Sequence, residues 1–307
     1  MRRVLTGLGL LAGLFIFWLF AVWPPPSWYR THWPRETAFM TRPHAAPPSA
    51  KARARGRLYH PVPLDSISAD MREAVMIGED NNFLTHGGID YLALAHALGY
   101  QRETFSWRDP RQRRELLAVL PSAWSKRERL RGASTISQHL AKNLYLSPSR
   151  NPLRKLKEAV ITWRLEAALG KRRIMELYLN VVELGEDVWG VEAASRLYFN
   201  QSARGISQEQ AAALAGALPF PLRSNPDYRP GRMRWRQNLI LRRMRGEQVE
   251  VPKPQEEEPV IEPAIPEPSA DSVAEAIAED SNPPTVVDTL APMPDQPPDS
   301  APPDSAP

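Results

Sequence analysis

An apolar run near the N-terminus constrains this chain more than any other feature. Val4 to Trp23 has no charged residue over twenty positions and is preceded by Arg2 and Arg3. A helix of that length spans a hydrocarbon core of about 30 Å. A cleaved signal peptide has a shorter apolar stretch of about 7–15 residues and a small-residue cleavage site, and the sequence offers no such site. We therefore expect residues 1–23 to form an uncleaved transmembrane anchor.

The composition of the chain changes sharply near residue 250. Glu250 to Pro307 holds 14 acidic residues, one basic residue, fifteen prolines and no aromatic residue. Such a segment cannot bury enough apolar surface to offset the entropy lost on ordering. Residues 249–307 are therefore predicted to be a disordered, Pro-rich acidic tail.

The rest of the chain is strongly basic, because all but one of the 39 basic residues precede this tail. A body of that charge indicates an anionic partner, such as nucleic acid, anionic lipid or a phosphate-bearing substrate. The chain has no cysteine, which excludes disulfides and thiolate metal sites.

Between anchor and tail, the sequence predicts a linker and one helical domain. Residues 24–57 carry prolines and scattered basic residues with little apolar periodicity, which is typical of a juxtamembrane linker. The domain is expected to span residues 58–248, with several helices and no convincing run of strands. Within it, residues 102–130 mix apolar and basic side chains, which predicts either a flexible flap at a bilayer surface or an ordinary solvated loop.

A first motif follows a predicted helix that begins at Ser68. Ser68 is a suitable N-cap, and the helix brings Glu79 and Asp80 to its end, followed by Phe83 and His86. A carboxylate at a helix end among apolar and aromatic residues can be half desolvated, as a general acid or base requires. Taken alone, however, a Glu-Asp pair is more often a surface feature.

Two further motifs open helices. Gly132-Ala-Ser-Thr-Ile-Ser-Gln138 supplies hydroxyl groups and a helix N-cap, and the N–H groups of such a terminus suit a phosphate. Asn151-Pro152 begins the next helix, in which Arg154, Lys155 and Glu158 lie in the first two turns. Arg154 and Glu158 are four residues apart, so an ordinary surface ion pair is the simpler interpretation. The apolar positions of this helix are Leu153, Leu156, Val160, Trp163 and Ala167, and Gly170 is expected to end it. Further along the chain, Ile174, Leu177, Tyr178 and Val181 form a stripe expected to be buried, and Ser207 to Gln210 form a capping box.

Taken together, these motifs resemble the signatures of the peptidoglycan glycosyltransferases. This domain polymerises glycan in class A penicillin-binding proteins and also occurs alone, in monofunctional biosynthetic transglycosylases. Two further runs match in order, Lys171 to Asn180 and Trp189 to Phe199, and the resemblance covers Leu58 to Met244. Each signature is weak alone, and the five in order are specific. The sequence departs from the family at His139, where Gln is usual, and at Asn200-Gln201, where Gly-Lys is usual.

The resemblance implies a mainly α, lysozyme-like domain with two lobes. Its activity would join a growing glycan on undecaprenyl pyrophosphate to the 4-hydroxyl of lipid II. The implied catalytic residues are Glu79, as general base, and Glu158, which would orient partners or help to bind a cation. Lys142, Arg154 and Lys155 would neutralise the pyrophosphate. The other implied substrate-binding residues are Asp80, Phe83, His86, Ser134, Thr135, Gln138 and Asn143. A divalent cation such as Mg²⁺ is compatible with the resemblance, although no metal-ligand spacing requires it.

The resemblance also implies a place for the protein in the cell envelope. We expect a single-pass inner-membrane protein with a cytoplasmic N-terminus and a periplasmic domain, for which Arg2 and Arg3 give only partial support because Arg30, Arg35 and Arg42 follow the run. The expected partners are lipid II, the carrier-linked glycan, the membrane and, through the tail, proteins of cell-wall synthesis or division.

Other classes of function stay open at this point. A lysozyme-like hydrolase or lytic transglycosylase would also use one exposed Glu, but would not need the cluster of basic residues. A non-catalytic envelope scaffold would need only the anchor and the tail. Nucleic acid is not expected as a partner, because the chain has a membrane anchor and no recognisable nucleic-acid-binding module.

Overall fold

The computed structural model describes residues 2–42, 49–106, 108–119, 134–146 and 152–252. The chain divides into two compact units, Met1–Pro259 and Val260–Pro307, and every described residue belongs to the first unit. The following description concerns that unit alone. Nearly all of the predicted tail lies outside the described residues.

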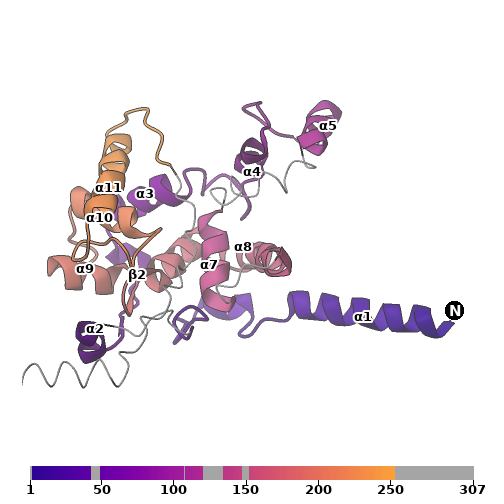
Figure 1. The fold of residues 1–307 in the computed structure, drawn as a ribbon, viewed down its shortest axis with the longest axis horizontal. Coiled ribbons are helices and arrows are strands. Elements are labelled where there is room, and N and C mark those ends of the chain that lie inside the picture. The colour runs from indigo at the N-terminus through magenta and orange to yellow at the C-terminus, as the bar shows by residue number, and fades with distance from the viewer. Residues whose placement is uncertain (1, 43–48, 107, 120–133, 147–151, 253–307) are drawn as a thin grey trace, which may run out of the picture. The chain divides into compact units, whose positions relative to one another are not determined.

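Helices dominate the described part of the chain, as the sequence predicts (Figure 1). The strands are β1 (Leu58–Tyr59), β2 (Glu183–Gly185) and β3 (Val188–Trp189). The helices are α1 (Arg2–Phe20), η1 (Pro26–Arg30), α2 (Ala50–Arg55), η2 (Leu64–Ser66), α3 (Ala69–Glu79), α4 (Tyr91–Leu98), α5 (Pro110–Val119), α7 (Ile136–Tyr145), α8 (Pro152–Val181), α9 (Val191–Phe199), α10 (Gln208–Ala217) and α11 (Gly231–Met244).

Helix α1 is long and apolar enough to cross a membrane. Its segment Arg3–Phe20 has a mean hydropathy of 1.9, and its side chains are almost entirely exposed. The end of this helix contacts α8, where the ammonium group of Lys157 lies 4.6 Å from the ring centre of Trp18. Arg164 of α8 also donates a hydrogen bond to the backbone carbonyl of Phe20. These contacts link α1 to the helical domain.

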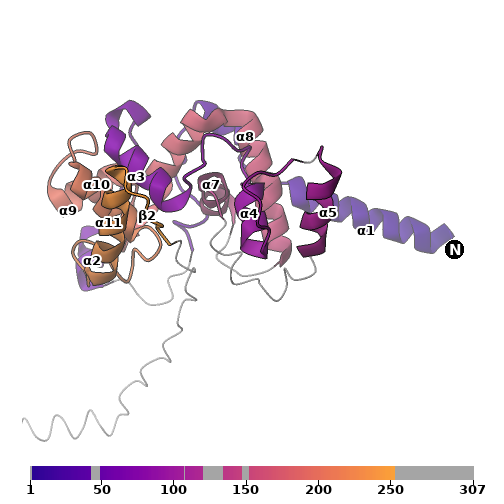
Figure 2. The same cartoon turned by 90° about the horizontal axis from the view of Figure 1, so that it is seen from above.

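The main hydrophobic core lies where α3, α7, α8, α9 and α10 meet. Helix α10 packs against both α3 and α11, and α7 packs against α8 (Figures 1 and 2). Helix α3 buries Met71, Ala74, Val75 and Gly78, the face expected from their spacing. A second, smaller cluster of Ala95, Tyr100 and Leu116 joins the region of α4 to α5. A third cluster of Ala213, Ala217 and Met233 joins α10 to α11. The mainly helical architecture agrees with the expected fold class.

The domain contains a small sheet, although the sequence shows no convincing run of strands. Three short strands form a sheet in the order β1-β3-β2, in which β1 runs parallel to β3 and β2 antiparallel to it. Each strand has only two or three residues. An alternating pattern needs about four or more residues to be recognised, so the sequence carried no signal for this sheet.

The segment expected to be a juxtamembrane linker packs onto the domain. Tyr29 and Met40 are members of the main core and are only 3% and 2% exposed. The backbone carbonyl of Tyr29 accepts a hydrogen bond of 2.7 Å from Arg173 of α8. The region lacked periodicity because single side chains, rather than the face of a helix, anchor it to the core.

The charged segment after α4 contains a helix, α5, where a loop or flap was expected. Arg102 donates two hydrogen bonds of 2.6 Å to the carboxylate of Glu115. Leu116 is buried and Leu117 is exposed. The loop interpretation is therefore wrong for residues 110–119, while residues 120–130 lie outside the described part of the chain.

The orientation of α8 also differs from the sequence pattern. Leu153, Leu156 and Trp163 of the apolar stripe are 50%, 44% and 46% exposed, although Val160 is buried. The helix is interrupted at Gly170, whose φ of 72° is non-helical, at the position where the sequence predicted a helix end. The second half, after Gly170, buries the expected stripe of Ile174, Leu177, Tyr178 and Val181.

Candidate active site

Glu79 is the last residue of α3 and is 9% exposed. The helix begins at Ser68, whose side chain accepts the N–H of Met71 as predicted. One carboxylate oxygen of Glu79 lies 3.3 Å from the guanidinium of Arg236 on α11, and the other lies 3.6 Å from Nε2 of His139 on α7. Glu79 therefore lies between side chains from two elements that are distant in sequence.

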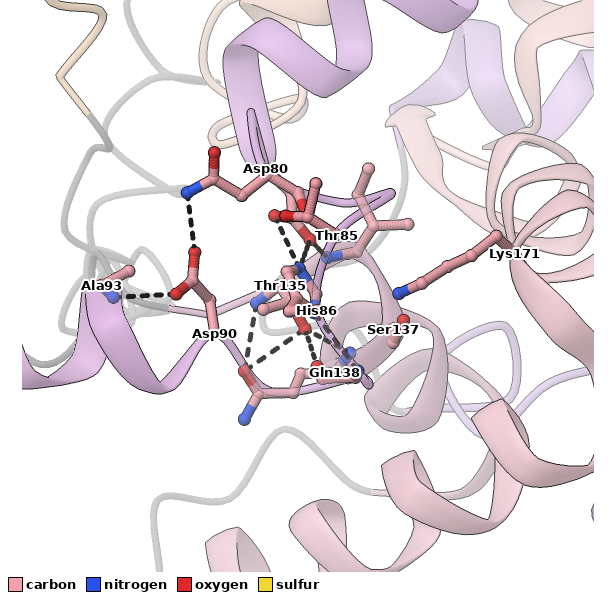
Figure 3. Close-up of polar contacts among 12 residues, drawn as sticks. Asp80, Thr85, His86, Asp90, Ala93, Thr135, Ser137, Gln138 and Lys171 are labelled. Atoms are coloured by element: carbon pink, nitrogen blue, oxygen red, sulfur yellow. Dashed lines mark hydrogen bonds and ion pairs between the residues drawn. The ribbon is translucent and has the colours of Figure 1, made fainter. Parts of the chain in front are cut away.

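Asp80 ties the end of α3 to the beginning of α7. Its carboxylate accepts the N–H of Ile136 at 3.0 Å and lies 3.0 Å from Nε2 of His86 (Figure 3). Nδ1 of the same ring accepts the N–H of Gly88 at 3.2 Å. Because Nδ1 is an acceptor, Nε2 carries the proton and donates a hydrogen bond to Asp80. Asp80 is 2% exposed, so the structure uses Asp80 and His86 to fix the motif loop.

Gly88 allows this loop to approach α8. Its φ of +95° lies in the region that L residues avoid. A Cβ atom at this position would also lie 2.8 Å from Cγ of Glu166 and 2.9 Å from Cγ2 of Thr162. Only glycine satisfies both conditions, which gives a physical reason for a glycine after the His in the first motif.

Thr135 and Gln138 form the predicted cap of α7. The hydroxyl of Thr135 accepts the N–H of Gln138 at 3.2 Å, and Oε1 of Gln138 accepts the N–H of Thr135 at 3.1 Å. The same hydroxyl donates to the carbonyl of Gly88 (Figure 3). The N–H of Ile136 goes to Asp80. The protein itself therefore binds two N–H groups of this terminus, where the sequence suggested a phosphate.

Glu158 is at the centre of a second charged group. Its carboxylate is 2% exposed and accepts hydrogen bonds from Arg154, at 2.8 Å, and from Lys155. The ammonium group of Lys155 also donates to the hydroxyl of Ser134, at 3.2 Å, and its side chain is 49% exposed. The predicted ion pair of Arg154 and Glu158 exists but is largely buried, whereas Lys155, the second partner of Glu158, is half exposed.

The two carboxylate regions meet at the first turns of α7. His139 and Ile136 contact Glu79 and Asp80, and Ser134 contacts Lys155. The beginning of α7 therefore connects the end of α3 to the beginning of α8. A carboxylate and a cationic cluster supported by the same short helix can act on one substrate.

Three other predicted residues take different places. Phe83 is 1% exposed beneath the ammonium group of Lys171, which lies 4.4 Å from its ring centre. Asn143 is also buried. Lys142 has its ammonium group 5.4 Å from the ring centre of Phe39. Phe83 and Asn143 are packed within the protein, where they support the site.

Sequence reasoning missed Arg236 and assigned no role to His139. Arg236 is completely buried, and the structure places it in the stripe formed by Met233, Arg236 and Ile240 on α11. These positions have the spacing i, i+3, i+7, which is typical of a buried helix face. An arginine within such a stripe was a usable signal, because buried charged residues are almost always paired.

The described residues give no support to a bound metal ion. Among the residues that the structure describes, no group of three or more His, Cys, Asp or Glu side chains could hold a metal. Both carboxylate oxygens of Glu158 face cations, Arg154 and Lys155. This arrangement suits the positioning of positive charge.

A cavity of about 400 Å³ lies beside α3 and the loop that follows it. It shares no lining residue with the predicted site. Its walls come from α3, the loop that follows it and α11, through Glu73, Met76, Ile77, Asn81, Leu84, Thr85 and Arg243.

The fold and the paired carboxylates fit a helical enzyme of glycan chemistry, and comparison with known proteins gives the family. The family model described as transglycosylase matches residues 49–108 and 112–245. The chain belongs to this transglycosylase family.

Three relatives are each named biosynthetic peptidoglycan transglycosylase. That of Thiobacillus denitrificans is 38% identical over 240 residues, covering 78% of this chain and 91% of the relative. That of an Azoarcus species is 38% identical over 245 residues, covering 76% and 94%. That of Acinetobacter baumannii is 33% identical over 248 residues, covering 81% and 96%.

Proposed function

We propose that this chain is a monofunctional peptidoglycan glycosyltransferase that polymerises lipid II into β-1,4 glycan strands for the bacterial cell wall. Membership of the transglycosylase family and the names of the relatives support this activity. The family model that matches the chain is that of the transglycosylase domain. The observation that carries the proposal is the position of Glu79, at a helix end that is joined through α7 to a cationic cluster.

In the proposed reaction, Glu79 is the general base. The 4-hydroxyl of lipid II attacks the anomeric carbon of the carrier-linked glycan and transfers its proton to the Glu79 carboxylate. The bond from that carbon to pyrophosphate breaks, so that undecaprenyl pyrophosphate leaves and the configuration inverts. A positioned base contributes about 10²–10⁴-fold to such a step.

The basic cluster stabilises the leaving group. Negative charge grows on the pyrophosphate as the glycosidic bond breaks, and cations fixed beforehand stabilise it most effectively. Lys155 is half exposed and is held by Glu158 and Ser134, while Arg154 is held by Glu158. Glu158 thus acts as a positioning carboxylate. Lys142, one helical turn after His139, adds further positive charge.

This arrangement favours synthesis over the lysozyme-like alternative. A hydrolase or lytic transglycosylase removes a sugar from a sugar, and the leaving hydroxyl needs a proton rather than a cationic cluster. A scaffold needs neither buried carboxylate. Glu79 and Glu158 are both largely buried beside cations. Burial of such ion pairs costs desolvation free energy and is weak evidence for a stabilising role, which favours a catalytic one.

The domain is proposed to work at the periplasmic face of the inner membrane, with α1 as a single-pass anchor and the N-terminus in the cytoplasm. The exposed stripe of Leu153, Leu156 and Trp163 supports a position at the membrane surface, because it lies on the same half of α8 that contacts the end of α1. Exposed apolar patches mark membrane or protein contacts. The tail is proposed to bind proteins of cell-wall synthesis or division.

Incubation of the full-length protein in detergent micelles with lipid II tests the proposed activity. Long glycan strands and free undecaprenyl pyrophosphate are the expected products. Incubation with polymerised peptidoglycan should release no muropeptides. Release of muropeptides would establish the hydrolase alternative. Absence of both activities, in a protein that melts cooperatively, would favour the scaffold.

A further inference from the structure

Arg236 has an unusual position for an arginine. Its side chain is completely buried on α11, and its guanidinium donates hydrogen bonds to the backbone carbonyls of Gly78 and Pro252. The nitrogen that bonds Gly78 also lies 3.3 Å from the carboxylate of Glu79. One cation therefore contacts both the last turn of α3 and the side chain of its final residue.

Glu79 needs such a partner for two physical reasons. It is the last residue of α3, where the helix dipole places partial negative charge and disfavours a carboxylate. It is also largely buried, and burial disfavours the charged form of an acid. Both effects favour a protonated Glu79. A general base must instead be ionised before the reaction.

Arg236 opposes both effects. Its bond to the Gly78 carbonyl satisfies a backbone acceptor that the helix end leaves unpaired, and its charge favours an ionised neighbour. Burial lowers the pKa of the Arg236 guanidinium, and the charge of Glu79 counteracts that effect. A guanidinium nonetheless keeps its proton in proteins, so its charge is constant.

Three other titratable groups near Glu79 in the described part of the chain, His139, Tyr178 and Asp80, are not permanent cations. His139 of α7 lies 3.6 Å away, and an imidazole changes charge near neutral pH. Tyr178 of α8 lies beyond His139, with the two ring centres 6.4 Å apart. Asp80 follows Glu79 in the chain and is paired with His86.

We propose that Arg236 is a positioning residue that keeps Glu79 ionised and correctly placed as the base. This inference rests on the proposed function only in assigning the role of general base to Glu79. The effect of Arg236 on the charge of Glu79 can be measured without any substrate.

The test compares the full-length wild type with Arg236→Gln, Arg236→Lys and the matched control Arg234→Gln, an exposed arginine on the same helix. All four proteins are placed in nanodiscs with ¹³C-labelled glutamate carboxyl groups, and the Glu79 resonance is assigned by its loss in Glu79→Gln. We expect Arg236→Gln to raise the titration midpoint of Glu79 by about 1–3 pH units, the effect of an opposite charge at this distance. Arg236→Lys should raise it less, and Arg234→Gln should leave it unchanged.

The pH profile of lipid II polymerisation provides the second readout. The acidic limb of kcat/KM should move upward in Arg236→Gln together with the midpoint. An unmoved midpoint and an equal loss of activity at every pH would overturn the inference and leave Arg236 a purely structural role. If Arg236→Gln fails to melt cooperatively, Arg236→Lys decides, because it moves the charge away from Glu79. A raised Glu79 midpoint in Arg236→Lys would support the inference, and an unmoved midpoint would overturn it. A wild type that does not polymerise lipid II would refute the proposed function, while the titration would still test Arg236.

Discussion

The end of α3 and the beginning of α8 each bury a carboxylate beside cations, but they obtain these cations in different ways. Glu158 is paired within its own helix, to Arg154 four residues before it and to Lys155 three residues before it. Glu79 meets Arg236 and His139, which come from α11 and α7. One group is local and partly exposed through its lysine, and the other depends on the packing of the whole domain.

The difference suggests a division of labour. A carboxylate whose two oxygens are held by neighbours on one helix serves mainly to position those neighbours. A carboxylate at a helix end, with partners provided by tertiary contacts, can be tuned as a proton acceptor. Substitutions in the two regions should therefore affect different kinetic and thermodynamic quantities.

The largest effect is expected for Glu79→Gln. The amide keeps the size of the side chain but accepts no proton at neutral pH, so kcat for lipid II polymerisation should fall by about 10²–10⁴-fold with little change in KM. Glu73→Gln, at an exposed position of the same helix, is the matched control and should keep wild-type activity. A loss below tenfold in Glu79→Gln would remove Glu79 from the role of base.

The second largest effect is expected for Glu158→Gln, which should lower both the activity and the stability of the protein. Losing this carboxylate releases Arg154 and Lys155 from their positions, and misplacement by about 1 Å lowers rates by up to about 10²-fold. The free energy of unfolding should also fall, by less than the about 3–5 kcal/mol of a fully buried pair, because Lys155 is half exposed. Denaturant unfolding and steady-state kinetics measure the two effects. Activity lost without any change in stability would indicate direct contact with substrate instead.

Lys155→Met should have an intermediate effect. It removes one half-exposed charge but keeps the aliphatic part of the side chain, so kcat/KM should fall by about tenfold, or about 1.4 kcal/mol. Exposed charges are screened by salt. The difference from wild type should therefore shrink as NaCl is raised from about 50 to about 500 mM, because the Debye length shortens. A difference that is independent of salt would contradict an electrostatic role.

Ser134→Ala should have the smallest effect. The hydroxyl of Ser134 accepts one hydrogen bond of 3.2 Å from Lys155, and a single bond of this kind contributes about 0.5–1.5 kcal/mol. Since Glu158 also holds Lys155, we expect a loss of less than about threefold in kcat/KM. In a double-mutant cycle with Lys155→Met, the two losses should not add. Additive losses would mean that Ser134 acts on the substrate independently.

The sequence predicted the local structure around these sites well. The caps at Ser68 and Ser207, the N-cap of α7 and the break at Gly170 are all present. The pair of Arg154 and Glu158 was also visible as an i,i+4 spacing. Such features involve residues within about one helical turn, so their geometry follows from the sequence.

Several features depended on contacts between distant segments. The spacing of Leu153, Leu156 and Trp163 marked an apolar face of α8 but could not say that this face is exposed. The short strands of the sheet carried too few residues to show a pattern. Packing of single side chains, including Tyr29, fixed the segment that was expected to be a linker.

The sequence by itself determined that a membrane-length apolar helix precedes a basic helical domain, and that Glu79 stands at the end of a helix. Only the tertiary structure decided which groups surround that carboxylate. Arg236 reaches Glu79 across 157 positions of sequence because α11 packs against α3 and both helices pack against α10. Helix formation is governed by neighbours in the chain, whereas the charge of a buried group is governed by neighbours in space.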